Sequence, residues 1–281
     1  MMRIMLGIPE IAAEASFGMA LAAAGVPAEK LGDCLFLSDS FSAVELPVEL
    51  LERKEASYLL ARALRGCRMV QIGSIIDGNV ARNLPFSSES LFQEFAAYTE
   101  KVLTLFHSIG IRTVTFDPGM NEILGDDRML NATLHLLHLI APVLNRTGMT
   151  LLLPFTLPCA DPELPARLVR FLRRSMIPEL KVRLDIQSHE IPRKRTVPSV
   201  LAGTLLLEVR SILFRYDADA GNILLADHLL PWLEAMSALA FSGSWLAAPV
   251  SKGAVRFPAE ALRFSALLEE LRKKEAPEPK N

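Results

Sequence analysis

The stretch VRLDIQSHEI, Val182 to Ile191, joins an apolar, strand-like run to a polar segment that begins where the run ends. The run is short and mostly apolar, which is typical of a parallel strand buried on both faces. Asp185 lies at its end and His189 follows four residues later. A buried strand with polar side chains at its C-terminal end recurs along this chain, and that recurrence decides the fold.

Short apolar segments alternate eight times with longer amphipathic segments. The predicted strands are Arg3–Ile8, Cys34–Asp39, Met69–Ile75, Thr113–Asp117, Thr150–Phe155, Lys181–Ile186, Ser211–Tyr216 and Ser244–Ala248. The predicted helices are Glu10–Ala24, Val48–Leu64, Glu89–Ile109, Asp127–Asn145, Pro162–Arg174, Thr196–Ala202, Asp227–Ala238 and Ala259–Lys274. Eight such units in 281 residues match the size and order of an α/β fold, a single (β/α)8 TIM barrel. A doubly wound open sheet is the alternative, but no predicted strand is followed by a glycine-rich phosphate turn.

The composition bounds the domain organisation and the partners. Hydrophobic residues make up 51% of the chain, enough for one large core, which we predict over residues 1–274. The end, EAPEPKN at 275–281, has nothing to bury and is predicted to be a disordered tail. Thirty basic and 32 acidic residues give a net charge of −2. That balance lacks the one-sided basic field of proteins that bind nucleic acid or anionic membranes, so neither partner is expected.

The cysteines and the apolar segments bear on localisation. Cys34, Cys67 and Cys159 are few, odd in number and set among apolar neighbours, which favours reduced thiols and a cytoplasmic protein. The first 25 residues resemble a secretory leader in composition, but Glu10 and Glu14 interrupt the apolar run that a leader needs. The longest uncharged segments fall short of the ~20 apolar residues of a membrane span, so no transmembrane helix is predicted.

Polar residues that follow the predicted strands are the candidates for chemistry, because active sites of such barrels form at the C-terminal strand ends. Aspartates in these places also cap helices or close turns, and we assign such roles to Asp39, Asp77 and Asp227. Asp117 precedes Pro-Gly, a turn signature, and its structural and functional interpretations are equally supported.

Asp185 and the segment Arg215-Tyr216-Asp217-Ala218-Asp219 follow adjacent predicted strands and should face the same mouth of the barrel. Carboxylates brought together in this way either share a proton or hold a cation. A salt bridge from Arg215 to Asp185 or Asp217 is the structural alternative. The residues alone leave structure, ligand binding and a metal site open.

Basic residues lie near the same mouth. The loop after Asp185 contains Arg193, Lys194 and Arg195, and Lys252 follows the last predicted strand. These groups suit a phosphate. A solvated basic loop is nevertheless the favoured interpretation, because a charge run alone is weak evidence.

Five segments between residues 98 and 250 resemble, in order, the xylose isomerase-like sugar phosphate isomerases and epimerases. They are YTEKVLTLFHSIGIRTVTFDPG (98–119), APVLNRTGMTLLLPF (141–155), VRLDIQSHE (182–190), ILFRYDADAGN (212–222) and FSGSWLAAPV (241–250). The resemblance implies a TIM barrel whose family binds a divalent metal, such as Mn, Zn or Mg, through Glu, Asp, His and Glu. These ligands come from strands five to eight, and the two glutamates also act as acid and base.

Only one of the four implied ligands is present in this chain. The sixth-strand aspartate matches Asp185, whereas the fifth-strand glutamate falls at or next to Pro154. The seventh-strand histidine falls on Phe214 or Arg215, and the eighth-strand glutamate on Ala247 or Ala248. His189 is displaced by one residue from the histidine that accompanies the aspartate, and Asp217 matches the aspartate after the seventh strand. One carboxylate does not hold a divalent ion in a site built for four ligands, so no cofactor is expected unless the family site survives.

Two hypotheses follow. In the first, the protein is a divergent sugar isomerase or epimerase that acts on a sugar or sugar phosphate. Its tentative catalytic residues are Asp185, His189 and Asp217, and its tentative substrate-binding residues are Asp117, Arg215, Asp219 and Lys252. In the second, it is a non-catalytic barrel that binds a ligand or a protein, because apolar residues stand at positions where the resemblance implies metal ligands.

Overall fold

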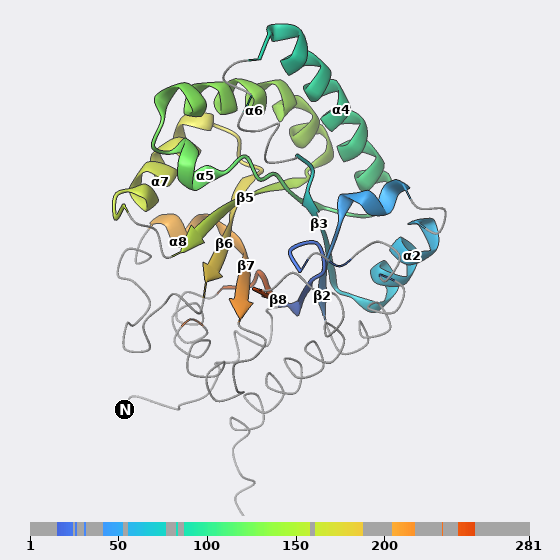
Figure 1. Ribbon diagram of the computed structural model, residues 1–281. Coiled ribbons are helices and arrows are strands. Elements are labelled where there is room, and N and C mark those ends of the chain that lie inside the picture. Colours follow the sequence, from blue (N-terminus) through green and yellow to red (C-terminus); the bar gives the residue numbers. More distant parts are fainter. Residues whose placement is uncertain are drawn as a thin grey trace, which may run out of the picture.

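The computed structural model describes residues 16–24, 26, 31, 42–52, 56–76, 83, 87–157, 161–187, 204–216, 232 and 241–250. Its centre is a closed barrel of parallel strands in the order β1 to β8, with β8 paired to β1 (Figure 1). The strands are β1 Ser16–Ala20, β2 Ala43–Leu46, β3 Met69–Ser74, β4 Thr113–Thr115, β5 Thr150–Leu157, β6 Leu180–Gln187, β7 Val209–Tyr216 and β8 Ser244–Pro249. The predicted (β/α)8 barrel is therefore confirmed, and the doubly wound open sheet is wrong.

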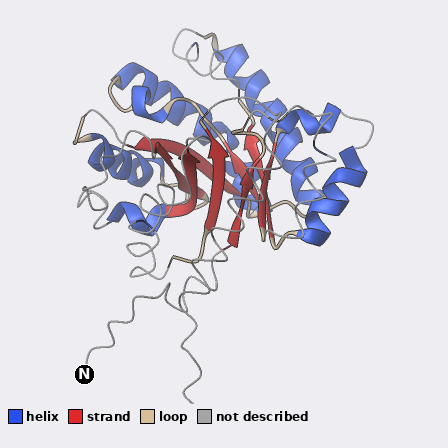
Figure 2. Ribbon diagram, turned by 60° about the horizontal axis from the view of Figure 1, so that its bottom comes forward, coloured by secondary structure: helices blue, strands red, loops and turns tan. Residues whose placement is uncertain are grey.

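Helices lie around the outside of the barrel (Figure 2). They are the 3-10 helix η4 Val48–Glu52 and the α-helices α2 Ala56–Gly66, α4 Glu89–Ser108, α5 Met120–Ile123, α6 Asp127–Thr147, α7 Leu164–Ser175 and α8 Thr204–Glu208. The two longest begin at capping side chains, because Ser88 accepts the N–H of Leu91 and Asp126 accepts two N–H groups of the first turn of α6. Among the described helices, none is both long and apolar enough to cross a membrane.

From β3 onward the barrel agrees with the predicted order of strands. Strands β3 to β8 overlap the predicted strands, and α4, α6 and α7 overlap the predicted helices with small shifts at their ends. Within the predicted helix Val48–Leu64, the described residues form the 3-10 helix η4 and the α-helix α2, which continues to Gly66. The predicted helices Thr196–Ala202 and Ala259–Lys274 and the tail at 275–281 lie outside the described residues. The same holds for Asp227–Ala238 apart from Trp232, which is helical.

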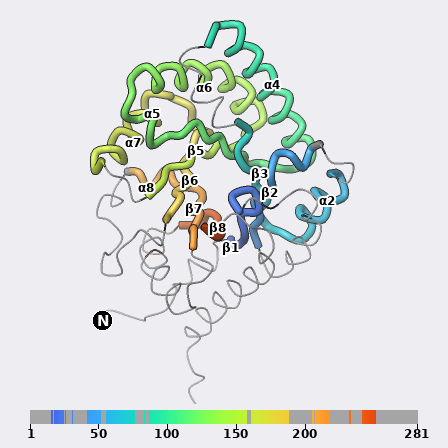
Figure 3. The backbone as a smooth tube through the Cα atoms, in the orientation of Figure 1, coloured from blue at the N-terminus to red at the C-terminus, as the bar shows by residue number. Residues whose placement is uncertain are grey.

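The first two strands differ from the prediction. β1 lies inside the segment Glu10–Ala24, which was predicted to be a helix, and β2 begins after the predicted strand Cys34–Asp39. The segments Arg3–Ile8 and Cys34–Asp39 lie outside the described residues, and their places in the barrel are taken by β1 and β2. Figure 3 shows β1 between β2 and β8, as the strand pairing requires.

A close approach of two backbones explains the glycine in β1. A Cβ atom on Gly18 would lie 1.6 Å from the carbonyl oxygen of Ala43 in β2. No side chain fits there, so glycine lets the two strands pair. Glycine is uncommon inside strands, and this is one reason why β1 was not predicted from the sequence.

The core has two layers that follow from the alternation of side chains along each strand. On β5, Leu151, Leu153 and Phe155 are fully buried and alternate with Leu152 and Pro154. Pro154 is level with Arg183 of β6, whose side chain reaches across the barrel interior. One set of side chains therefore packs against the surrounding helices, while the other fills the barrel.

Candidate functional site

A charged cluster occupies the interior of the barrel. Arg183 of β6 donates from Nε and Nη2 to the two oxygens of Asp185, at 2.6 and 3.0 Å, and from Nη1 to Oε2 of Glu45 at 2.7 Å. Glu45 is on β2, which lies opposite β6 in the closed strand order. The two strands can meet only through the interior, so these three side chains, the charged cluster, lie near the barrel axis.

Neutral polar groups extend the charged cluster to other strands. The amide nitrogen of Gln71 on β3 donates to Oε2 of Glu45 at 2.9 Å, and the amide oxygen of Gln71 accepts from the Ser244 hydroxyl at 3.3 Å. Ser244 on β8 also lies 2.8 Å from the hydroxyl oxygen of Ser211 on β7. With the contact of Arg183 Nη1 to the Thr115 hydroxyl on β4, a continuous hydrogen-bonded network links six strands. It satisfies buried polar groups that would otherwise be costly.

Burial and charge act together on Arg183. Arg183 and Asp185 are each 5% exposed and Glu45 is 1% exposed. Burial by itself would lower the pKa of the guanidinium, but the charges of Asp185 and Glu45 outweigh it and raise that pKa above its ordinary value. Arg183 is thus a permanent cation inside the barrel, and its charge is shared between two carboxylates.

The structure places three of the predicted site residues. Asp185 is in the charged cluster, and its salt-bridge partner is Arg183, whereas the sequence had left open a salt bridge from Arg215 to Asp185 or Asp217. Arg215 lies near the end of β7, where its Nη1 donates to the carbonyl oxygen of Ala23 at 3.3 Å. Asp117 follows β4 and lines a separate cavity. The other candidates lie outside the described residues, namely His189, Asp217, Asp219, Lys252, Asp39, Asp77 and Asp227.

Strand pairing shows which residues stand in the four positions where the resemblance implies metal ligands. Side chains on one face of β6 include Arg183, Asp185 and, by alternation, Gln187. Gln187 is level with Arg215 of β7, which is level with Ala248 of β8. Of the alternatives left open by the sequence, Arg215 and Ala248 therefore face the interior, whereas Phe214 and Ala247 face the helices.

These positions do not fit a divalent cation. The inward residues on β5, β7 and β8 are Pro154, Arg215 and Ala248, none of which is a metal ligand. Both oxygens of Asp185 are already bound by a guanidinium. Among the residues that the structure describes, no three His, Cys, Asp or Glu side chains are grouped so that they could hold an ion.

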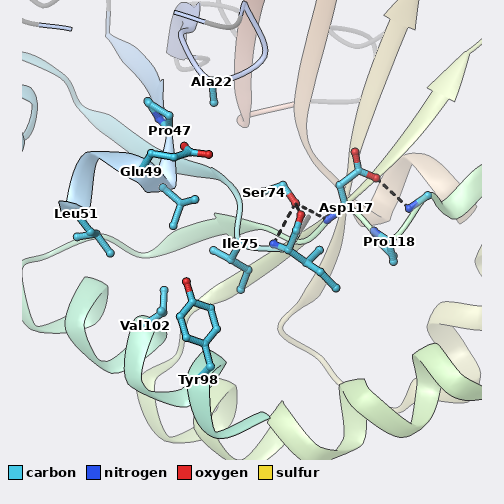
Figure 4. Close-up of a pocket in the computed structure, with 13 residues that line it drawn as sticks. Ala22, Pro47, Glu49, Leu51, Ser74, Ile75, Tyr98, Val102, Asp117 and Pro118 are labelled. Carbon is cyan, nitrogen blue, oxygen red and sulfur yellow. Dashed lines mark hydrogen bonds between the residues drawn. The ribbon is translucent and has the colours of Figure 1, made fainter. Parts of the chain in front are cut away.

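A cavity of about 780 Å³ opens at the C-terminal ends of β2 to β4, between η4 and α4. Figure 4 shows Tyr98 approaching it from α4, Glu49 from η4 and Asp117 from the end of β4. The remaining lining is mostly apolar, with Ala22, Pro47, Val48, Leu51, Ile75, Ile76, Val102 and Pro118, together with Ser74 and Gly119. A cavity of this size with few polar groups suits a small organic molecule.

Asp117 is held in the cavity wall by local hydrogen bonds. Its Oδ1 accepts the N–H of Gly119 at 3.1 Å, and its own N–H donates to the Ser74 hydroxyl at 3.1 Å. Burial raises the pKa of the Asp117 carboxyl above its ordinary value, and the Gly119 N–H and the charge of Arg183 oppose this only in part. A carboxyl with a raised pKa keeps its proton to a higher pH than an exposed aspartate does.

The sequence interpretation missed the residues that bind Asp185. Arg183 was read as part of an apolar strand, and Glu45 was not placed in a strand at all. The available signal was a charged residue at alternate positions with Asp185 in an otherwise apolar run. A charge inside a buried strand requires a partner of opposite sign, which would have prompted a search for one.

Comparison with known proteins supports the fold. No protein family model matches the chain, and no curated protein matches it. Among solved structures, L-ribulose 3-epimerase superposes with a TM-score of 0.67 at 13% identity, covering 95% of this chain and 100% of that one. A xylose isomerase domain protein from Alicyclobacillus acidocaldarius gives 0.63 at 18% identity, covering 92% and 98%. D-psicose 3-epimerase, solved in the presence of D-fructose, gives 0.59 at 14%, covering 92% and 96%. The fold is a xylose isomerase-like TIM barrel.

Proposed function

We propose that the protein is a divergent sugar isomerase/epimerase-like barrel that binds a sugar or a related polyol without metal-dependent chemistry. One observation carries the proposal: Asp185, the single residue that matches a ligand of the implied metal site, is bound on both oxygens by Arg183. The neighbouring interior positions are Pro154, Arg215 and Ala248, so the acid and base glutamates of the resemblance have no counterpart there. The likeness to solved epimerase structures supports a sugar-like ligand.

The cavity beside Asp117 is the ligand site of this proposal. It lies at the C-terminal strand ends, where barrels of this kind bind their ligands. Tyr98 supplies an aromatic face, and the carboxylate of Asp117 has lone pairs left for the hydroxyl groups of a polyol. The described lining contains two carboxylates, Glu49 and Asp117, and no Lys, Arg or His. That charge favours an uncharged sugar over the sugar phosphate of our sequence hypothesis, because a phosphate would be repelled.

Binding experiments test this function directly. Wild-type protein is titrated by calorimetry with D-fructose and with fructose 6-phosphate, once in EDTA and once in MnCl2. We expect the free sugar to bind equally in both buffers and the phosphate to bind more weakly. Tyr98→Ala and Asp117→Ala should weaken binding, whereas the surface variant Glu100→Gln should bind as wild type does. Sugar turnover that requires Mn²⁺ would contradict the proposal.

A second candidate function is isomerisation or epimerisation without a metal, and the raised pKa of Asp117 favours it. In this case Asp117 exchanges a proton with the carbon next to the sugar carbonyl. The test is deuterium uptake from D2O into a ketose, followed by NMR. Uptake by wild type that disappears in Asp117→Asn supports catalysis, whereas binding without uptake supports the non-catalytic barrel.

The proposal retains a cytoplasmic location. Cys67 is a buried thiol, as expected for the reduced state that we predict for the three cysteines. Counting free thiols in protein purified without reductant tests this part, since three reactive thiols after denaturation are expected.

A further inference from the structure

The charged cluster has the composition of a cation site that already contains its cation. Carboxylates from opposite walls, Glu45 on β2 and Asp185 on β6, converge on one positive group. All three residues are at most 5% exposed. The group between them is the guanidinium of Arg183, which comes from the same strand as Asp185, two residues earlier.

All three nitrogens of the guanidinium contact protein oxygens. Its Nε and Nη2 face Asp185, and its Nη1 faces Glu45 at 2.7 Å and the Thr115 hydroxyl at 3.4 Å. Each of its three nitrogens therefore has a partner inside the barrel. A guanidinium that binds an anionic ligand presents its fork toward that ligand, whereas this fork is closed by Asp185. The contacts assign Arg183 to the barrel itself and not to ligand binding.

We propose that Arg183 is the resident cation of this barrel: its guanidinium occupies the space between Glu45 and Asp185, and these two carboxylates accept a divalent ion only when the guanidinium is removed. This inference goes beyond the proposed function, because it holds whether or not a sugar binds. It also goes beyond the loss of ligands described above, since it predicts that Glu45 and Asp185 bind a divalent ion once Arg183 is removed.

The physical reason lies in what Arg183→Ala would leave behind. Two carboxylates would face each other in a dry interior with no counter-charge, and the volume of a guanidinium would become empty. Hard divalent ions prefer carboxylate oxygens, and the amide of Gln71 and the hydroxyl of Thr115 lie beside the same space. Lysine in place of Arg183 would keep a positive charge and should keep the metal out.

The experiment measures Mn²⁺ binding to the full chain. The loss of the free Mn²⁺ signal in electron paramagnetic resonance gives the number of ions bound, and thermal unfolding gives the change in Tm. Wild type and Arg183→Lys should bind no Mn²⁺ and show no change in Tm. Arg183→Ala should bind one ion per chain, with a Tm higher by about 5 °C at ~100 times the dissociation constant. Adding Asp185→Asn to Arg183→Ala should abolish this binding.

Arg146→Ala is the matched control, because it removes a surface arginine and should behave as wild type does. One Mn²⁺ bound by wild type and lost in Asp185→Asn would overturn the proposal. So would folded Arg183→Ala that binds none. If Arg183→Ala does not fold, Arg183→Gln is measured in the same way. Failure of both to fold even in about 1 mM MnCl2 also counts against the proposal, because the ion should replace the lost charge.

Failure of this inference is distinguishable from failure of the proposed function. The inference is read from metal binding alone, whereas the proposed function is read from sugar binding in EDTA. Whether wild type binds sugar does not alter the expected Mn²⁺ binding of the Arg183 variants. Mn²⁺ binding by those variants likewise does not alter the expected sugar binding.

Discussion

Two aspartates at the C-terminal side of the barrel have opposite surroundings. Asp185 on β6 lies in the charged cluster, with both oxygens bound by Arg183. Asp117, just after β4, lines the cavity and accepts one backbone N–H, from Gly119. Both occupy positions where a barrel enzyme would carry a working carboxylate. The difference shows that topology supplies such a position, but the nearest counter-charge decides whether the carboxylate is structural or free for chemistry.

The largest expected effect is on stability and comes from removing the shared cation. Arg183→Ala should lower the free energy of unfolding by about 3–5 kcal/mol in metal-free buffer, because it leaves Glu45 and Asp185 buried without compensation. Urea denaturation in EDTA measures this. The surface pair of Arg146 with Glu100 gives the reference, since Arg146→Ala should cost less than about 1 kcal/mol. Equal losses in the two variants would show that the charged cluster is not special.

Changing each aspartate to asparagine sharpens the comparison. Asp185→Asn removes a charged hydrogen-bond partner of a buried guanidinium and should cost about 2 kcal/mol. Asp117→Asn keeps an acceptor for the Gly119 N–H and should cost much less at acid pH. Both variants are compared by urea denaturation under identical conditions. If Asp117→Asn proved the more damaging, the assignment of structural and available carboxylates would have to be exchanged.

A smaller effect is expected at the edge of the network. Ser244→Ala removes the hydroxyl that donates to Gln71 and contacts Ser211, and we expect a loss of about 1 kcal/mol. Sugar binding in the cavity should not change, because Ser244 is not part of its lining. Calorimetric titration of this variant alongside the urea experiment separates the two regions. A clear loss of sugar affinity would join them into one site.

The smallest effect concerns the pH dependence of Asp117. Because its folded pKa is raised, Asp117 releases its proton more readily in the unfolded chain, and its contribution to stability falls as pH rises above the ordinary value of 3.8. The free energy of unfolding of Asp117→Asn relative to wild type should therefore increase between about pH 3 and neutral pH. Denaturation curves over this range test it. A difference that stays constant or shrinks as pH rises would contradict the raised pKa.

The sequence located β3 to β8 but misplaced β1 and β2, and the physical reasons are particular. Glu45 stands in the middle of β2, where a carboxylate argues against a buried strand. It is tolerated because Arg183 neutralises it from a residue 138 positions away. Gly18 in β1 is required by the close approach of Ala43, which is likewise a tertiary contact. The local pattern of apolar and polar residues reveals neither of these tertiary contacts.

As with the strands, only part of the candidate site could be predicted from the sequence. The end of β6 was recognised, but Asp185, which we expected at the mouth of the barrel, is buried inside it. Arg183 was overlooked because its alternation with Asp185 identifies a face of the strand but not the partner that occupies that face. Asp117 was predicted as equally a turn residue and a site residue, and it lines the cavity while also accepting the turn N–H of Gly119.

The two bonds of Arg183 also differ in how far they reach along the chain. Its contact with Asp185 spans two residues and can form in any fragment that contains β6. Its contact with Glu45 spans 138 residues and requires both halves of the barrel to be in place. The contact between Arg183 and Glu45 can therefore form only when the barrel is closed. A chain cut between β4 and β5 would carry the two partners on separate pieces, and their reunion would mark the assembly of the two half-barrels.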